Sequence, residues 1–180
     1  PLILSLQAAT AGTHQSLDYI PGSVLLGLAA SRLYAELDES SAWTLFHSGH
    51  IRFGDALPIV NDEIAWPVPL SWHTYKGSVA EENGQLIASS LFDPALQSTE
   101  DTRQPVQLRS GYVTRTGKRV VPRCQQTLKT AIDRSKGMAA EGQLFGYEAI
   151  CVGQNYRFQL SADESVDPSL WQRLLAALTG

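Results

Sequence analysis

The chain has only two cysteines, Cys124 and Cys151, among its 180 residues, and it has no long hydrophobic run. Two cysteines without C-x-x-C spacing cannot form a disulfide scaffold, and such a composition is typical of a reducing compartment. The apolar stretches, residues 24–30 among them, are far shorter than the roughly 20 residues that a membrane-spanning helix needs. The chain also does not open with the basic and then apolar segment of a secretory leader. We therefore expect a soluble, cytoplasmic protein with no membrane partner.

Acidic residues are nearly absent from residues 102–136, where Asp133 is the only one. This basic segment holds nine of the fourteen Lys and Arg residues of a chain whose net charge is -4. Concentrated cations of this kind usually face a polyanion or an acidic protein surface. From charge alone, RNA, an acidic neighbouring subunit and plain solvation of a surface hairpin all remain open.

The hydropathy pattern predicts an α+β fold. Apolar alternation or short runs of strand-forming residues predict strands at residues 2–8, 50–53, 64–72 and 156–160. Pro58, Pro67 and Pro69 are expected to break the middle region into short edge strands joined by turns.

Two segments have a helical period. Ser23 is expected to cap the first helix, which follows the turn at residues 21–22 and places apolar residues on one face at 25, 28, 29, 33 and 37. The second helix is expected to be capped by Asp167, with Pro168 at its first position and apolar residues from 170 to 178.

A basic β-hairpin is predicted over residues 106–121, with its turn at Thr116 and Gly117, and residues 79–102 are predicted to form a loop. The order strand, helix, irregular strands, strand and helix is most of a split βαβ, ferredoxin-like (RRM-like) unit. Its closing strand is not found before Gly180. We thus predict a single domain over residues 1–180, with a loop and hairpin insertion at about 77–128.

Three motifs occur in order along the chain. They are I-P-G-S at residues 20–23, F-H-S-G-H-I-R-F-G-D-A-L-P at 46–58 and A-I-D-R-S-K-G-M-A-A-E-G-Q-L-F at 131–145. In this order and spacing the motifs resemble those of the RAMP superfamily, the repeat-associated proteins of CRISPR effector complexes. The segment P-V-P-L-S-W-H-T-Y-K at 67–76 is most similar to the type III-D subunit that sits near the 5′ handle of the guide RNA. The chain departs from the family at Leu26, where many members have an arginine.

The resemblance implies a ferredoxin-like RAMP domain in a type III CRISPR RNA-guided effector complex, where the chain binds guide RNA and helps assemble the complex for antiviral defence. The implied partners are the CRISPR guide RNA, other effector subunits and target RNA, with no cofactor. Lys and Arg side chains would neutralise phosphates, and a helix N-terminus would bind a further phosphate. A histidine would stack on a base or form a hydrogen bond with it. The residues expected to contact RNA are His14, Ser23, Lys76, Arg115, Lys118, Arg119, Arg123, Lys129, Arg134 and Lys136.

Other roles for particular residues also follow from the sequence. Cleaving RAMP subunits place an acid between the first strand and the first helix, so Asp18 is the candidate if the chain is instead a metal-dependent endoribonuclease. We favour a non-catalytic subunit, since no nucleophile with a matching base is evident. Two roles are open for Tyr112 from the sequence: it could stack on a base, or it could be a buried strand residue. A glycine at Gly27 would let a backbone or a phosphate approach the first helix closely.

Overall fold

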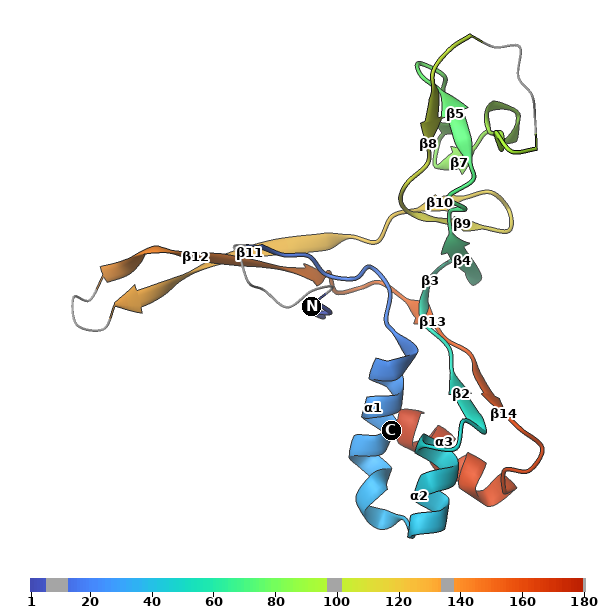
Figure 1. The fold of residues 1–180 in the computed structure, drawn as a ribbon, viewed down its shortest axis with the longest axis vertical. Helices are drawn as coiled ribbons and strands as arrows, with labels where there is room; N and C mark the ends of the chain where they lie inside the picture. The colour runs from blue at the N-terminus through green and yellow to red at the C-terminus, as the bar shows by residue number, and fades with distance from the viewer. Residues whose placement is uncertain (6–12, 97–101, 134–137, 180) are drawn as a thin grey trace. The chain divides into compact units, whose positions relative to one another are not determined.

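The computed structural model describes residues 1–5, 13–96, 102–133 and 138–179 (Figure 1). The chain divides into two compact units. The strand unit comprises Pro1–Asp18 and Pro58–Asn155, and the helical unit comprises Tyr19–Leu57 and Tyr156–Gly180. Helices and mainly antiparallel strands occur together, which confirms the predicted α+β class. Within the described residues, no helix is both long enough and apolar enough to cross a membrane.

The strand unit is built largely from short antiparallel pairs. Four strands lie in the order β10-β9-β4-β3, and their bounds are β3 Leu57–Val60, β4 Glu63–Pro67, β9 Tyr112–Thr114 and β10 Arg119–Val120. The turn between β3 and β4 uses two residues in the left-handed region, Asn61 (φ 50°) and Asp62 (φ 65°). Two consecutive residues with positive φ give the tight turn whose twist matches paired strands.

Two further pairs and a short helix complete this part of the strand unit. They are β5 His73–Tyr75 with β8 Pro105–Gln107, β6 Glu81–Glu82 with β7 Gln85–Leu86, and η2 Ala88–Ser90. The predicted hairpin turn at Thr116 and Gly117 is confirmed, but its strands are shorter than expected, because β8 pairs with β5 instead. The predicted loop over 79–102 contains the β6–β7 hairpin, so that prediction was wrong there.

A long two-stranded hairpin is the other part of the strand unit (Figure 1). It pairs β11 Cys124–Asp133 with β12 Met138–Ile150, and β1 Thr13–His14 adds to β12 in parallel. The strand predicted over residues 2–8 is not regular where it is described, since residues 1–5 make only two isolated bridges, Leu2 with Ile150 and Ser5 with Ser16.

The helical unit contains three α-helices, a 3₁₀ turn and short strands within its described residues. Their bounds are α1 Gly22–Leu33, η1 Tyr34–Glu36, α2 Glu39–Phe46, β2 Ile51–Phe53, β13 Tyr156–Arg157, β14 Leu160–Ala162 and α3 Pro168–Thr179. One apolar cluster holds the unit together, and its buried members are Ala29, Leu33, Leu45, Ile51, Val166, Leu170 and Leu174. Burial of these side chains supplies most of the stabilisation that such a small unit can have.

The second and third helices begin at aspartate caps. Asp167 was predicted as a cap, and its carboxylate accepts a hydrogen bond from Ser169 N at 2.8 Å, which confirms the prediction. Asp38 caps α2 in the same way, accepting from Ser41 N at 2.9 Å and from Ser41 Oγ at 2.7 Å. The hydrogen bonds from Ser41 lower the pKa of Asp38. The helix α2 was not predicted from the sequence.

The first helix begins two residues earlier than predicted, at Gly22 rather than Val24. Pro21 occupies the cap position and Ser23 lies exposed inside the first turn, so the prediction that Ser23 caps the helix was wrong. The free N–H of Gly22 instead donates to Asp55 Oδ1 at 2.8 Å. A carboxylate at a helix N-terminus accepts a hydrogen bond from an otherwise unpaired N–H, and its negative charge interacts favourably with the helix dipole.

The first two sequence motifs contact each other in the helical unit. Ile20 and Ala56 exchange two backbone hydrogen bonds, of 3.1 Å and 2.8 Å. A Cβ added to Gly22 would lie 2.1 Å from the backbone oxygen of Phe53, so only glycine fits there. Nothing lies within 4 Å of a Cβ added to Gly27, so no described part of the chain uses the close approach expected at that glycine.

Pro58 lies inside β3 rather than at a break. The strand tolerates it because its pairing with β4 runs through Ile59 and Val60, so the β3–β4 ladder needs no N–H at residue 58. The single strand predicted over 156–160 is instead two short strands, β13 and β14.

Candidate RNA-binding surface

Lys129 lies on β11 in the strand unit, close to an aromatic ring of β12. Its Nζ is 5.2 Å from the centre of the Tyr147 ring, and the lysine is exposed. Tyr147 is paired in register with Thr127 on one side and with the backbone of His14 on the other. The backbones of His14 and Lys129, two predicted RNA contacts that are far apart in the sequence, therefore lie on the strands that flank β12 on its two sides.

Arg134 and Lys136, the other predicted cations of this hairpin, lie outside the described residues. Their contacts with RNA remain predictions from the sequence. The described part of the hairpin offers an ammonium group and an aromatic ring side by side, which is a combination that can bind a phosphate and an adjacent base.

A second feature of the strand unit is an open groove over β4 and β9. Ala65 on β4 is fully buried, so strand alternation turns the next side chain, Trp66, outward, and it is 58% exposed. Trp66 is paired in register with Val113 of β9. The groove has a volume of about 450 Å³, and its lining includes Trp66, Pro67, Pro69, Trp72, Val113 and Arg115. We call it the tryptophan groove.

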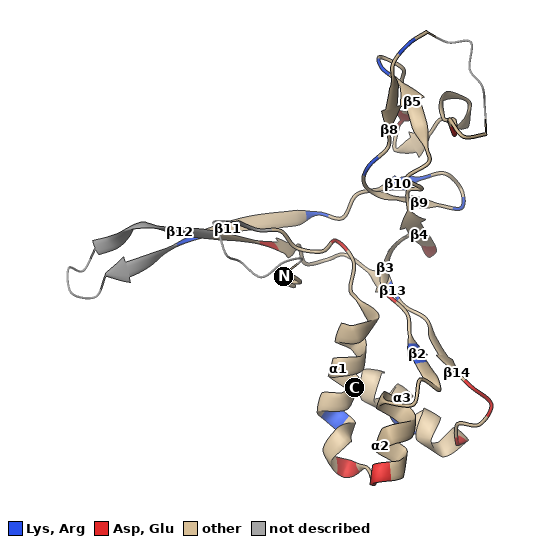
Figure 2. Cartoon of the chain, in the orientation of Figure 1, with Lys and Arg blue, Asp and Glu red and all other residues tan. Residues whose placement is uncertain are grey.

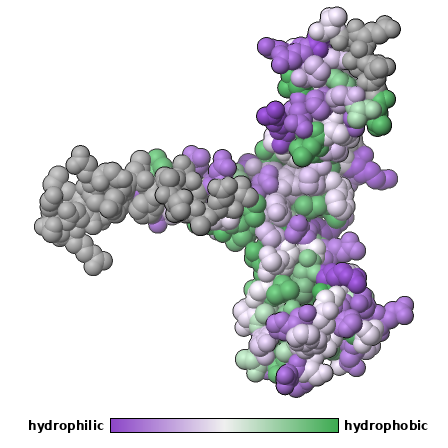
Figure 3. Space-filling view, viewed as in Figure 1, coloured by the Kyte–Doolittle hydropathy of each residue, from purple (hydrophilic) through white to green (hydrophobic). Residues whose placement is uncertain are grey.

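The charge at the tryptophan groove comes from Arg115, an exposed residue directly after β9. The carboxylate of Glu63 accepts a hydrogen bond from Thr116 Oγ1 at 2.7 Å. That hydrogen bond, with a smaller contribution from the charge of Arg115, lowers the pKa of Glu63. Arg115 therefore has a nearby counter-charge, yet its guanidinium remains accessible at the edge of the groove. Figure 2 shows Lys and Arg residues on the β9–β10 hairpin, and Figure 3 shows hydrophobic and hydrophilic surface interleaved over the strand unit.

Arg119 has contacts within the protein. Its Nη1 lies 3.1 Å from Glu81 Oε2, and its Nη2 donates to the backbone oxygen of Ser110 at 3.1 Å. The side chain is only 25% exposed. Arg119 thereby ties the β9–β10 hairpin to the β6–β7 hairpin, and its predicted contact with RNA stays a prediction.

Three other predicted cations of the strand unit lie at turns or strand ends. Lys76 follows β5 and is exposed, Lys118 is half-buried in the β9–β10 turn, and Arg123 is exposed just before β11. The amide of Gln154 holds the backbone of Arg123, accepting from its N–H at 2.6 Å and donating to its oxygen at 2.9 Å. Lys118 shares the β9–β10 hairpin with Arg115, whereas Ser23 belongs to the helical unit.

Asp18, the alternative catalytic residue, is half-buried and accepts a 2.6 Å hydrogen bond from the hydroxyl of Tyr112. Tyr112 is itself buried, at 4% exposure, which favours the strand role for it over base stacking. Burial raises the pKa of the Cys124 thiol, and the charges of Glu148 and Asp18 add to this effect. Across the described residues, no three His, Cys, Asp or Glu side chains are grouped as a metal site requires.

No protein-family model matches the chain, and no curated protein matches it either. The site residues that sequence reasoning missed are Trp66 and Trp72. The available signal was the alternation at residues 64–66, where a small residue is followed by a large aromatic one. Without the pairing partner, that alternation could not show which face of the strand was open.

Proposed function

We propose that the chain is an RNA-binding subunit of a type III CRISPR effector complex, and that its strand unit holds the guide RNA and helps to assemble the complex for antiviral defence. The observation that carries the proposal is the tryptophan groove, where exposed Trp66 and Arg115 line one open surface. An accessible indole and an accessible guanidinium are the groups that bind unpaired bases and phosphates.

The identity of the RNA rests on the motif resemblance. Its support from the structure is that the first two motifs, although distant in the sequence, contact each other at Gly22, Phe53 and Asp55. The proposal includes the ferredoxin-like (RRM-like) arrangement that the resemblance implies. A guide-holding protein need not distinguish most bases, because base pairing supplies the sequence specificity.

Binding would then combine stacking with charge neutralisation. A base stacked on Trp66 contributes about 1–3 kcal/mol, whatever its identity. Lys129 and its neighbours along the hairpin would neutralise phosphates and release counterions, which makes the affinity fall as salt rises. Both terms are largely independent of sequence, which suits a subunit that serves many different guides.

The charge part of the proposal is tested by the salt dependence of RNA affinity. We expect the triple variant Lys129→Ala, Arg134→Ala, Lys136→Ala to bind a single-stranded RNA more weakly than the parent chain. The slope of log affinity against log salt should become shallower by about 2, since each lost contact with a single strand removes roughly 0.7. Fluorescence anisotropy at several salt concentrations measures both quantities.

Arg173→Ala controls for the loss of one cation outside the hairpin, because Arg173 is an exposed cation of the helical unit. Its variant should keep the slope of the parent chain. An unchanged slope in the triple variant would exclude this end of the hairpin from the RNA-binding surface.

A further inference from the structure

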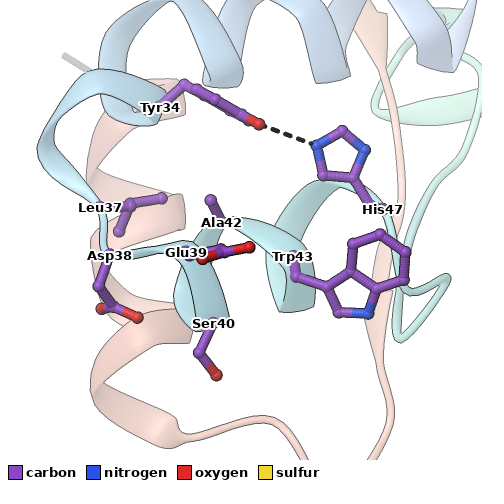
Figure 4. A pocket seen from close by; sticks show the side chains of 8 residues that line it. All are labelled: Tyr34, Leu37, Asp38, Glu39, Ser40, Ala42, Trp43 and His47. Carbon is purple, nitrogen blue, oxygen red and sulfur yellow. Dashed lines mark hydrogen bonds between the residues drawn. The ribbon is translucent and has the colours of Figure 1, made fainter.

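The helical unit has an open groove of its own between the end of α1 and the helix α2 (Figure 4). Its volume is about 1020 Å³, and Tyr34, Asp38, Glu39, Trp43 and His47 are among the residues that line it. We call it the α1–α2 groove. All of its lining residues belong to the helical unit, so the groove is complete without the strand unit.

The aromatic residues of the α1–α2 groove are exposed and yet held in place. Trp43 is 62% exposed and Tyr34 is 50% exposed. His47 lies stacked against Trp43, with ring centres 5.7 Å apart, and edge-on to Tyr34, with ring centres 5.8 Å apart. The Tyr34 hydroxyl and His47 Nε2 share a 3.2 Å hydrogen bond, drawn in Figure 4. Rings held in this way lose little entropy when a ligand covers them.

The charge of the α1–α2 groove is negative. Asp38 and Glu39 line it, no Lys or Arg does, and Figure 2 shows acidic residues where α2 begins. The hydrogen bonds from Ser41 lower the pKa of Asp38, so its carboxylate is charged at neutral pH. Glu39 and Trp43 are four residues apart on α2, and this spacing places them on the same face of the helix.

A carboxylate beside an exposed indole on one helix face matches a cationic side chain. A guanidinium or ammonium group can lie over the indole ring, attracted by its quadrupole, while it pairs with the carboxylate. The same carboxylates repel the phosphates of a nucleic acid. Because the groove is open to solvent, a side chain of a partner can reach Trp43 and Glu39 from outside.

We propose that the α1–α2 groove binds a basic segment of a partner protein, with an Arg or Lys side chain over Trp43 and paired with Glu39. The occupant follows from charge complementarity and from the exposed, fixed aromatic rings. This inference does not depend on RNA binding by the strand unit.

The test uses the full chain and a fluorescently labelled peptide of alternating Gly and Arg as the probe. We expect saturable binding, measured by anisotropy, that Trp43→Ala or Glu39→Lys each weakens about fivefold to tenfold, as the loss of a cation–π contact or an ion pair predicts. Trp43→Phe should retain most of the affinity. The control Glu82→Lys makes the same charge change at an exposed acid of the strand unit and should leave the affinity unchanged.

Three results would overturn the assignment. The first is a peptide that does not bind, or that binds Glu39→Lys and Glu82→Lys equally well. The second is equal binding of a peptide with Glu in place of Arg, which would remove the role of charge. The third is self-association of the chain that Glu39→Lys abolishes, which would make the occupant a second copy. Thermal unfolding of each variant, followed by circular dichroism, separates lost binding from lost folding.

Discussion

Replacing Trp66 and Arg115 together by alanine should weaken the binding of single-stranded RNA by about 30-fold or more. One stacked base contributes about 1–3 kcal/mol, and about 2 kcal/mol corresponds to that factor. Arg115 would add a phosphate contact, so its loss should also make the salt dependence shallower. Neither side chain is buried, and the variant should therefore keep its fold.

The chain offers a closely matched control for this double variant. Trp43→Ala combined with Arg173→Ala removes an exposed tryptophan and an exposed arginine from the helical unit. The composition and net charge of the two variants are then identical. We expect the RNA affinity of the control to equal that of the parent chain. If both variants lose affinity to the same degree, binding is a property of overall charge rather than of the tryptophan groove.

Gly22→Ala should destabilise the helical unit by about 3 kcal/mol or more, at the upper end of the usual cost of overpacking. The new Cβ would lie 2.1 Å from the oxygen and 2.8 Å from the carbon of the Phe53 carbonyl. Both atoms belong to the backbone, so the start of α1 would have to move away from β2. That movement would also disturb the hydrogen bond from Gly22 N to Asp55.

Gly27→Ala on the same helix is expected to have the opposite effect. Nothing lies within 4 Å of a Cβ at that position, and alanine is favoured over glycine in a helix by about 1 kcal/mol. Urea unfolding followed by circular dichroism measures both variants. Equal stability of the two would mean that the first motif does not pack on the Phe53 backbone as described.

The helix α3 was predictable because its signals are local. Asp167 and Pro168 mark its start, and the apolar period follows directly in the sequence. The same kind of signal was present for α2, where Asp38 precedes two serines, but the short helix carries little apolar period to confirm it. Asn83 and Gly84 form the turn of the β6–β7 hairpin, and this pair is a strong hairpin signal that the acidic surroundings obscured.

The candidate site was less predictable than the helices. Lys129 could be singled out from charge and motif, yet its position over Tyr147 depends on the register of β11 with β12. Trp66 lies in the tryptophan groove because β4 pairs with β9, a partner distant in the sequence. Charge alone also could not separate Arg115, which is accessible, from Arg119, which is paired with Glu81. Long-range pairing decides these features, and local sequence patterns do not encode it.

The most direct test of RNA binding by the strand unit is photocrosslinking of the full chain to a single-stranded RNA that carries photoreactive uridines, with the crosslinked peptides identified by mass spectrometry. We expect crosslinks within Pro58–Asn155, at the peptides that contain Trp66 and Tyr147, and we expect Trp66→Ala to remove the first of these. Crosslinks confined to the helices α1, α2 and α3 would contradict the proposal.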